Sequence, residues 1–148
     1  MKMYEIIDHI HALDGSLVIE PDERSAFPPL AWGDAFFYYA PDGVMPERTQ
    51  PYGTIITKDY PDDVRSRLNG PGRFRVNIHL TRERAAALAA ADADPAEPDI
   101  FVPHPVYGDA GWISVVNPDA RTADSVLELL RDAHEAARAR AERRRATS

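Results

Sequence analysis

The segment around His104 carries the side chains best suited to chemistry. His104 stands between Pro103 and Pro105, and the two proline rings disfavour helix and central-strand geometry, so a rigid loop should present the imidazole. Imidazole exchanges a proton near neutral pH, and Tyr107 and Trp112 follow closely. The segment therefore indicates one of two roles for His104. It is either a general acid or base with Tyr107 as its hydrogen-bond partner, or a loop histidine bonded to a backbone carbonyl.

A row of polar side chains forms the second candidate site. Apolar and polar residues alternate over residues 73–80, which is the two-residue period of a strand with one face in the core. The polar positions are Arg73, Arg75, Asn77 and His79. Arginine offers forked donors that match a carboxylate or a phosphate. The row is therefore either a surface that binds a small anion or a solvated sheet face.

Metal and cofactor motifs are missing from the sequence. His9 and His11 lie about 200° apart around a helix, so they cannot chelate one ion together. A metal site would need His79, His104 and a carboxylate such as Asp109 to converge, and we expect none. The chain has no cysteine and lacks the H-E-x-x-H, EF-hand, Walker and G-x-S-x-G patterns. We therefore expect neither a metal nor a cofactor.

Charge is spread unevenly along the 148 residues, whose formal net charge is -7. Residues 138–146 hold five arginines against one glutamate, a local charge of +4, which leaves -11 for residues 1–137. A basic tail over residues 138–148 could contact phosphates in a salt-dependent way. The acidic body opposes such binding, and the arginines also complement a helix dipole. We expect a solvated, fraying helix end and no nucleic acid partner.

The elements that must position these residues follow from hydrophobic spacing and turn signals. Predicted helices cover residues 3–13, 82–91 and a long segment from 122 onward, with Thr81 and Thr122 as N-caps. Predicted strands cover residues 17–19, 35–40, 52–57, 73–80 and 111–116. Residues 59–69 are polar and ambiguous, and the expectation there is one helical turn around Val64 and Leu68. The aromatic strand 35–40 should be central and covered on both faces. Most strand connections are too short for a parallel crossover, which favours an antiparallel sheet with helices on one face, a single α+β domain over residues 1–148.

The sequence also bears on where the chain resides. No apolar run approaches the roughly 18 residues of a membrane span, and Met1 leads directly into an amphipathic segment without an export signal. With no cysteine to oxidise, we expect a cytoplasmic protein that does not bind membranes. A homodimer is compatible with this composition.

Several stretches carry a resemblance to known proteins. They are residues 36–42, 52–60, 74–78 and 103–107, with Trp112 and Asn117-Pro118 behind them. Together they resemble a family of small actinobacterial proteins classified as a domain of unknown function. The His-Pro and Gly-Trp blocks are similar to the luciferase-domain proteins and to the MmcQ/YjbR-like fold, a compact α+β domain. The resemblance implies this fold and a cytoplasmic setting, and it assigns no activity to any residue.

These observations favour a small-ligand or protein-binding module. Its site should lie where Arg75, Asn77 and His79 meet the segment that carries His104, Tyr107 and Trp112. The expected ligand is a small anion. The alternative is an enzyme that uses His104 as general acid or base, with Tyr107 and Arg75 holding an anionic substrate.

Overall fold

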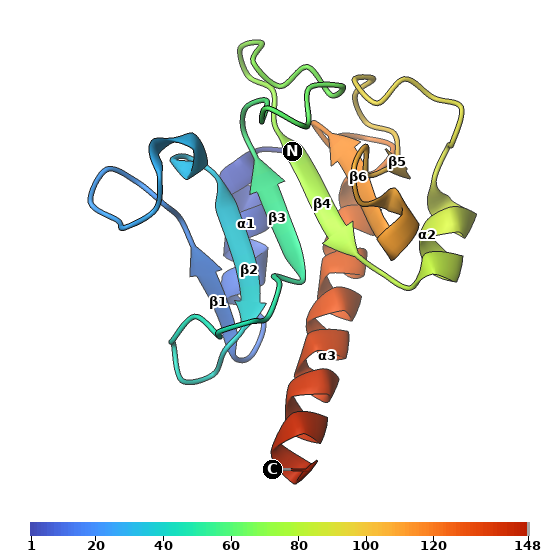
Figure 1. The fold of residues 1–148 in the computed structure, drawn as a ribbon. Coiled ribbons are helices and arrows are strands. Elements are labelled where there is room, and N and C mark those ends of the chain that lie inside the picture. Colours follow the sequence, from blue (N-terminus) through green and yellow to red (C-terminus); the bar gives the residue numbers. More distant parts are fainter. Residues whose placement is uncertain (148) are drawn as a thin grey trace.

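One antiparallel sheet of six strands organises the molecule, in the order β1-β2-β3-β4-β6-β5 (Figure 1). This computed structural model describes residues 1–147. The strands are β1 (Ser16–Ile19), β2 (Ala35–Tyr39), β3 (Gly53–Ile56), β4 (Arg75–His79), β5 (Val102–Pro103) and β6 (Trp112–Val116). The helices are α1 (Met3–His11), α2 (Arg82–Leu88) and α3 (Ala123–Thr147), with short 3-10 turns at Pro29–Ala31 and Gly108–Ala110. The predicted α+β fold is confirmed.

Helices cover one face of this sheet and close the apolar core. α1 and α3 lie behind the sheet in Figure 1, and α2 packs beside β5 and β6. Ile6 and Ile10 of α1, Leu130 of α3 and Val76 and Ile78 of β4 have no exposed surface. The apolar half of the alternation in residues 73–80 therefore faces the helices, as predicted.

The other half of that alternation forms a row across the sheet. Residues paired directly in an antiparallel sheet point to the same face. Asn77 is paired with Thr54 on β3 and with Ser114 on β6, and Thr54 is paired with Phe36 on β2. These four side chains share the face opposite the helices. They form the base of the site described below.

Two predicted elements differ from the structure. Residues 59–69 form a series of turns rather than a helical turn, because the Asp59 carboxylate accepts from the Leu68 backbone N–H and Tyr60 forms a β-bridge with Asp63. α2 ends at Leu88 rather than near residue 91, because the Ala90 N–H donates to the Phe101 carbonyl instead of continuing the helix.

α3 begins where predicted, directly after Thr122, and Asp99 holds the turn that precedes it. The Asp99 carboxylate accepts from the backbone N–H groups of Asp119, Arg121 and Thr122, and from the Thr122 hydroxyl. Asp99 has φ of 58°, a left-handed conformation that this set of hydrogen bonds stabilises. Burial acts to raise the pKa of Asp99, but these donors outweigh it and lower the pKa to about 2.

The basic tail is helical as far as Thr147, and residue 148 lies outside the described residues. Arg138 donates to Glu135 and Glu142, one turn away on either side. The fraying expected of this end stays a prediction. Within residues 1–147, no helix is long and apolar enough to cross a membrane.

Candidate functional site

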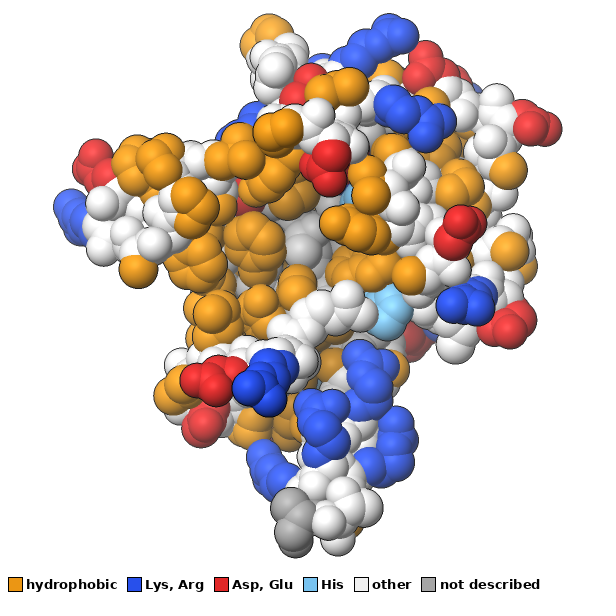
Figure 2. Space-filling view, viewed as in Figure 1, with side chains coloured by type: hydrophobic (Ala, Val, Ile, Leu, Met, Phe, Trp, Pro, Cys, Tyr) orange, Lys and Arg blue, Asp and Glu red, His pale blue; other side chains and the backbone are white. Residues whose placement is uncertain are grey.

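A cavity of about 440 Å³ opens on the sheet face opposite the helices. Strands β2, β3, β4 and β6 supply its base, and three loops supply its walls. The lining residues are Phe36, Gln50, Pro51, Thr54, Ile56, Tyr60, Asp62, Asp63, Arg75, Asn77, His104, Val106, Tyr107 and Trp112. Figure 2 shows hydrophobic side chains gathered in a hollow on this face. The cavity therefore combines mainly apolar and aromatic walls with polar groups at its base.

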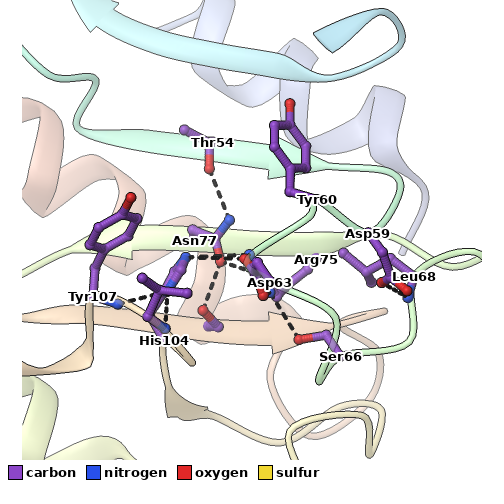
Figure 3. A network of polar contacts seen from close by, with 12 residues as sticks. Thr54, Asp59, Tyr60, Asp63, Ser66, Leu68, Arg75, Asn77, His104 and Tyr107 are labelled. Carbon is purple, nitrogen blue, oxygen red and sulfur yellow. Dashed lines mark hydrogen bonds and ion pairs between the residues drawn. The ribbon is translucent and has the colours of Figure 1, made fainter. Parts of the chain in front are cut away.

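Asn77 connects the polar groups at the base of the cavity (Figure 3). Its Oδ1 accepts from Arg75 Nε at 2.8 Å and from Ser114 Oγ at 2.7 Å, and its Nδ2 donates to Thr54 Oγ1 at 3.0 Å. Asn77 and Arg75 are 2% and 1% exposed, so neither is part of a solvated face. Both ends of the Asn77 amide are hydrogen-bonded, and these bonds fix the side chain and link β4 to the strands on either side of it.

Arg75 forms a buried bidentate ion pair with Asp63. Nη1 donates to Asp63 Oδ1 at 2.9 Å and Nη2 donates to Oδ2 at 2.6 Å, while Nη1 also donates to Ser66 Oγ. Burial acts to raise the pKa of Asp63, but the hydrogen bonds and charge of Arg75 outweigh it and hold that pKa below its usual value. The loop that carries Asp63 therefore closes over β4 and neutralises the cation there.

The hydrogen bonds of His104 select one tautomer of its ring. Nδ1 accepts from the backbone N–H groups of Val106 and Tyr107, both at 3.0 Å, so it carries no proton. The proton of the neutral ring is therefore on Nε2. Nε2 lies 3.3 Å from Arg75 Nη2, which is also a donor, and 4.0 Å from Asp63 Oδ2. Nε2–H thus has no close acceptor within the described residues.

This arrangement disfavours the charged form of His104. Burial is the main cause, and the neighbouring Arg75 cation adds to it, while Asp63 acts in the opposite direction. Together they lower the pKa of His104 to about 4. Protonation would also place a proton on Nδ1 and break two hydrogen bonds to the loop backbone. His104 is consequently a neutral donor near pH 7, and its remaining lone pair is already engaged.

The cavity walls are held by contacts outside it. The Tyr60 hydroxyl donates to Asp34 Oδ2 at 2.6 Å, and this fully buried carboxylate also accepts from Thr57 and Lys58. Burial and the Asp34 charge raise the pKa of Tyr60. Tyr60 is thereby fixed at the wall as a neutral phenol.

The opposite wall depends on a glycine. Gly111 has φ of 91°, and a Cβ there would lie 2.3 Å from the Leu80 carbonyl oxygen, so only glycine fits this approach. Trp112 follows it and stacks on His79, with ring centroids 5.1 Å apart. The Tyr107 ring packs against His104 at 5.1 Å. The start of β6 therefore places Trp112 in this wall, and the His104 loop places Tyr107.

Comparison with known proteins places the chain in a family. The sequence pattern of DUF6194, described as a family of unknown function, matches residues 1–146. The chain belongs to this family. Neither the curated proteins nor the solved structures gave a match. Membership in DUF6194 therefore supplies no activity, and the chemistry of this member has to be argued from the site.

In this member of DUF6194, most of the sequence-predicted site residues meet in one place. Arg75, Asn77, His104, Tyr107 and Trp112 all line the cavity. His79 is not among the lining residues; its ring stacks on the neighbouring Trp112 and its Nε2 donates to the Ala110 carbonyl. Tyr107 contacts His104 through its backbone N–H and its ring, rather than through its hydroxyl. Arg73 donates to the carbonyls of Ser66, Arg67 and Ala96, away from the cavity.

Several residues that form or support the site were not identified from the sequence, among them Asp63, Asp34 and Thr54. Asp63 and Asp34 lie in irregular segments, where no periodic pattern distinguishes one carboxylate from its neighbours. Thr54 lies in a predicted strand whose alternation is weak. One signal was present: an arginine between apolar strand residues needs a carboxylate partner when the strand is covered. Within residues 1–147, no group of three or more histidine, aspartate and glutamate side chains could hold a metal ion.

Proposed function

We propose that this DUF6194 protein is a binding module for a small molecule, which occupies the cavity over β3, β4 and β6. The observation that carries the proposal is the convergence of aromatic walls on a buried and fixed polar base. Ligand sites are usually clefts of about 300–1,000 Å³ with mostly apolar linings and a few well-placed polar groups. The cavity of about 440 Å³ has these properties.

The polar base also supports binding through its rigidity. Arg75, Asn77, Ser114 and Thr54 are joined by hydrogen bonds of 2.7 to 3.0 Å, and all four are under 9% exposed. Groups already held in place lose little conformational freedom when a ligand binds. A network of this kind lowers the entropic cost of recognition.

An enzyme that uses His104 as general acid or base is the second candidate function. It is favoured by the position of His104 at the cavity, beside Arg75. It is opposed by the engaged Nδ1 and by a pKa of about 4, since a useful base titrates near the working pH. We therefore rank binding above catalysis.

Other parts of the proposal rest on the sequence. We propose a cytoplasmic location, in keeping with the absence of cysteine. We also propose an actinobacterial origin from the resemblance over residues 36–42, 52–60, 74–78 and 103–107, and an MmcQ/YjbR-like relationship from the His-Pro and Gly-Trp blocks. Binding to a protein, including a second copy of this chain, is the other form of the module. Val106 and Tyr107, 41% and 54% exposed at the cavity rim, would be covered in such a complex. Sedimentation at several concentrations tests self-association.

A thermal-shift screen of small metabolites tests the binding function. A compound that binds only the folded state raises the melting temperature, by an amount that grows with its concentration over its dissociation constant. Tyr107→Ser should weaken the effect of each hit, because the Tyr107 ring forms part of the wall. Tyr4→Ser is the matched control, since Tyr4 is 65% exposed and lies on α1, which covers the other face of the sheet. Hits that are equally sensitive to both variants, or a screen without hits, would contradict the proposal.

A further inference from the structure

The charges around the cavity do not favour an anion. The charged lining residues are Arg75, Asp63 and Asp62. Arg75 and Asp63 neutralise each other through the bidentate pair, and the exposed Asp62 is left over. The net charge of the lining is therefore -1. An anionic ligand would lose hydration without gaining an uncompensated cation, which is costly.

The base of the cavity offers donors, and its neutral acceptor, Asn77 Oδ1, is already used. Asn77 Oδ1 accepts two hydrogen bonds, and both Asp63 oxygens bind Arg75. Within residues 1–147, no acceptor lies close to His104 Nε2–H, since Arg75 Nη2 at 3.3 Å is a donor and Asp63 Oδ2 is 4.0 Å away. The Thr54 hydroxyl accepts from Asn77, and no described residue accepts from it. Two neutral donors are thus available to a ligand that carries an acceptor.

The aromatic walls of the cavity favour an aromatic ligand. Phe36, Tyr60, Tyr107 and Trp112 bring aromatic rings to the cavity from β2, β6 and two loops. Aromatic rings gain from edge-to-face and offset-stacked contacts with another ring, in addition to the burial of apolar area. A cation would also meet aromatic faces, but at the base it would meet the Nε2–H of His104 and the guanidinium of Arg75.

From these observations, and resting on the proposed binding function, we infer that the cavity selects an uncharged aromatic molecule with a hydrogen-bond acceptor directed at His104 Nε2–H and the Thr54 hydroxyl. The sequence alone favoured an anionic ligand on the basis of Arg75. In the structure, the ion pair with Asp63 neutralises the Arg75 charge, so Arg75 no longer favours an anion.

Three probes of the same size and shape test the charge requirement. Benzamide is neutral and has an acceptor, benzoate is an anion, and benzamidine is a cation without a carbonyl. Each is titrated into ¹⁵N-labelled full-length protein while the indole N–H signal of Trp112 is followed. Trp32→Phe assigns the two indole signals, since these are the chain's two tryptophans. Benzamide should bind roughly tenfold or more tightly than either charged probe, because benzoate meets the uncompensated Asp62 carboxylate and no free cation, and benzamidine offers no acceptor to the donors at the base.

The outcomes separate this inference from the proposed function. Tightest binding of benzoate or benzamidine at Trp112 would overturn the inference and leave a small-molecule site in place. No response to any probe would also overturn it, and together with a negative metabolite screen it would remove the binding function itself.

Substitution of Asp62 gives an independent test without disturbing the buried network. Asp62 is exposed, so Asp62→Asn should fold normally. It should tighten benzoate binding several-fold relative to benzamide, because the uncompensated negative charge is gone. Glu47→Gln, which removes an exposed carboxylate outside this cavity, is the control and should leave the ratio unchanged. An equal effect of the two variants would contradict the charge argument.

Discussion

The two faces of the sheet are equally buried along β4, but they are buried in different ways. Val76 and Ile78 on one face, and Arg75 and Asn77 on the other, are all 0% to 2% exposed. The first pair lies in one apolar cluster with residues of α1 and α3, and α3 packs against β4. The second pair is covered by loops, and its polar atoms are satisfied by Asp63, Ser66, Thr54 and Ser114.

This difference determines what each face can do. Apolar packing has no directional requirement and fills its space, so the helical face is a core. A polar network needs specific partners in specific places, and the loops that supply them leave a cavity beside it. The proposed binding site therefore lies on the face covered by loops, and substitutions on the two faces should have different effects.

The largest effect is expected at the ion pair on the loop face. Asp63→Asn leaves the Arg75 charge buried without a counter-charge, and loss of one partner of a buried pair costs about 3 kcal/mol or more of unfolding free energy. Urea denaturation measures it. Asp62→Asn is the neighbouring control and should change stability by less than about 0.5 kcal/mol. Similar losses in the two variants would show that the pair with Arg75 is not formed in solution.

A core substitution on the sheet face covered by helices should cause the next largest loss of unfolding free energy. Ile78→Ala removes a fully buried side chain and should cost about 2–5 kcal/mol, according to how far the core relaxes. The distinguishing measurement is ligand binding: dissociation constants for hits at the cavity should stay within about twofold of the parent protein where the variant is folded. A large change in binding would mean that the two faces are not independent.

The sequence predicted the helical face better than the loop face, for a physical reason. Alternation over residues 73–80 shows which side of β4 is apolar, and it located Arg75 and Asn77 on the opposite side. It does not show what covers that side, because Asp63 and His104 reach β4 through irregular loops with long sequence separation. The proline pair around His104 predicted a fixed loop, whereas the tautomer depends on two backbone N–H groups that no side-chain pattern reveals.

Removal of the Asp99 carboxylate should have a smaller effect, in the turn that precedes α3. Asp99→Ala should cost about 1–2 kcal/mol, because three backbone N–H groups before α3 lose their acceptor. Since the folded pKa of about 2 is below the ordinary value of 3.8, this stabilisation is complete above pH 4 and is lost as the pH falls toward 2. The stability difference between parent and variant should therefore narrow on acidification. Asp92→Ala, at an exposed site, is the control.

The smallest effect is expected in the basic tail. Arg138 lies on the exposed part of α3, and its partners Glu135 and Glu142 are also exposed, so water and salt screen these pairs. Arg138→Ala should leave the denaturation midpoint unchanged within error. A loss as large as that of Asp63→Asn would mean that the surface pairs matter as much as the buried one.

The protonation state of His104 provides the most direct test of the account, because donation from Nε2–H distinguishes a ligand-binding face from an acid or base. Long-range ¹H–¹⁵N correlation spectra of the histidine rings, with His104→Asn used to assign its signals, report the tautomer and its titration. We predict a neutral Nε2–H ring at pH 7 that stays neutral down to about pH 5, in keeping with a pKa of about 4. A ring protonated at Nδ1, or one that titrates near its ordinary value of 6.5, would contradict it.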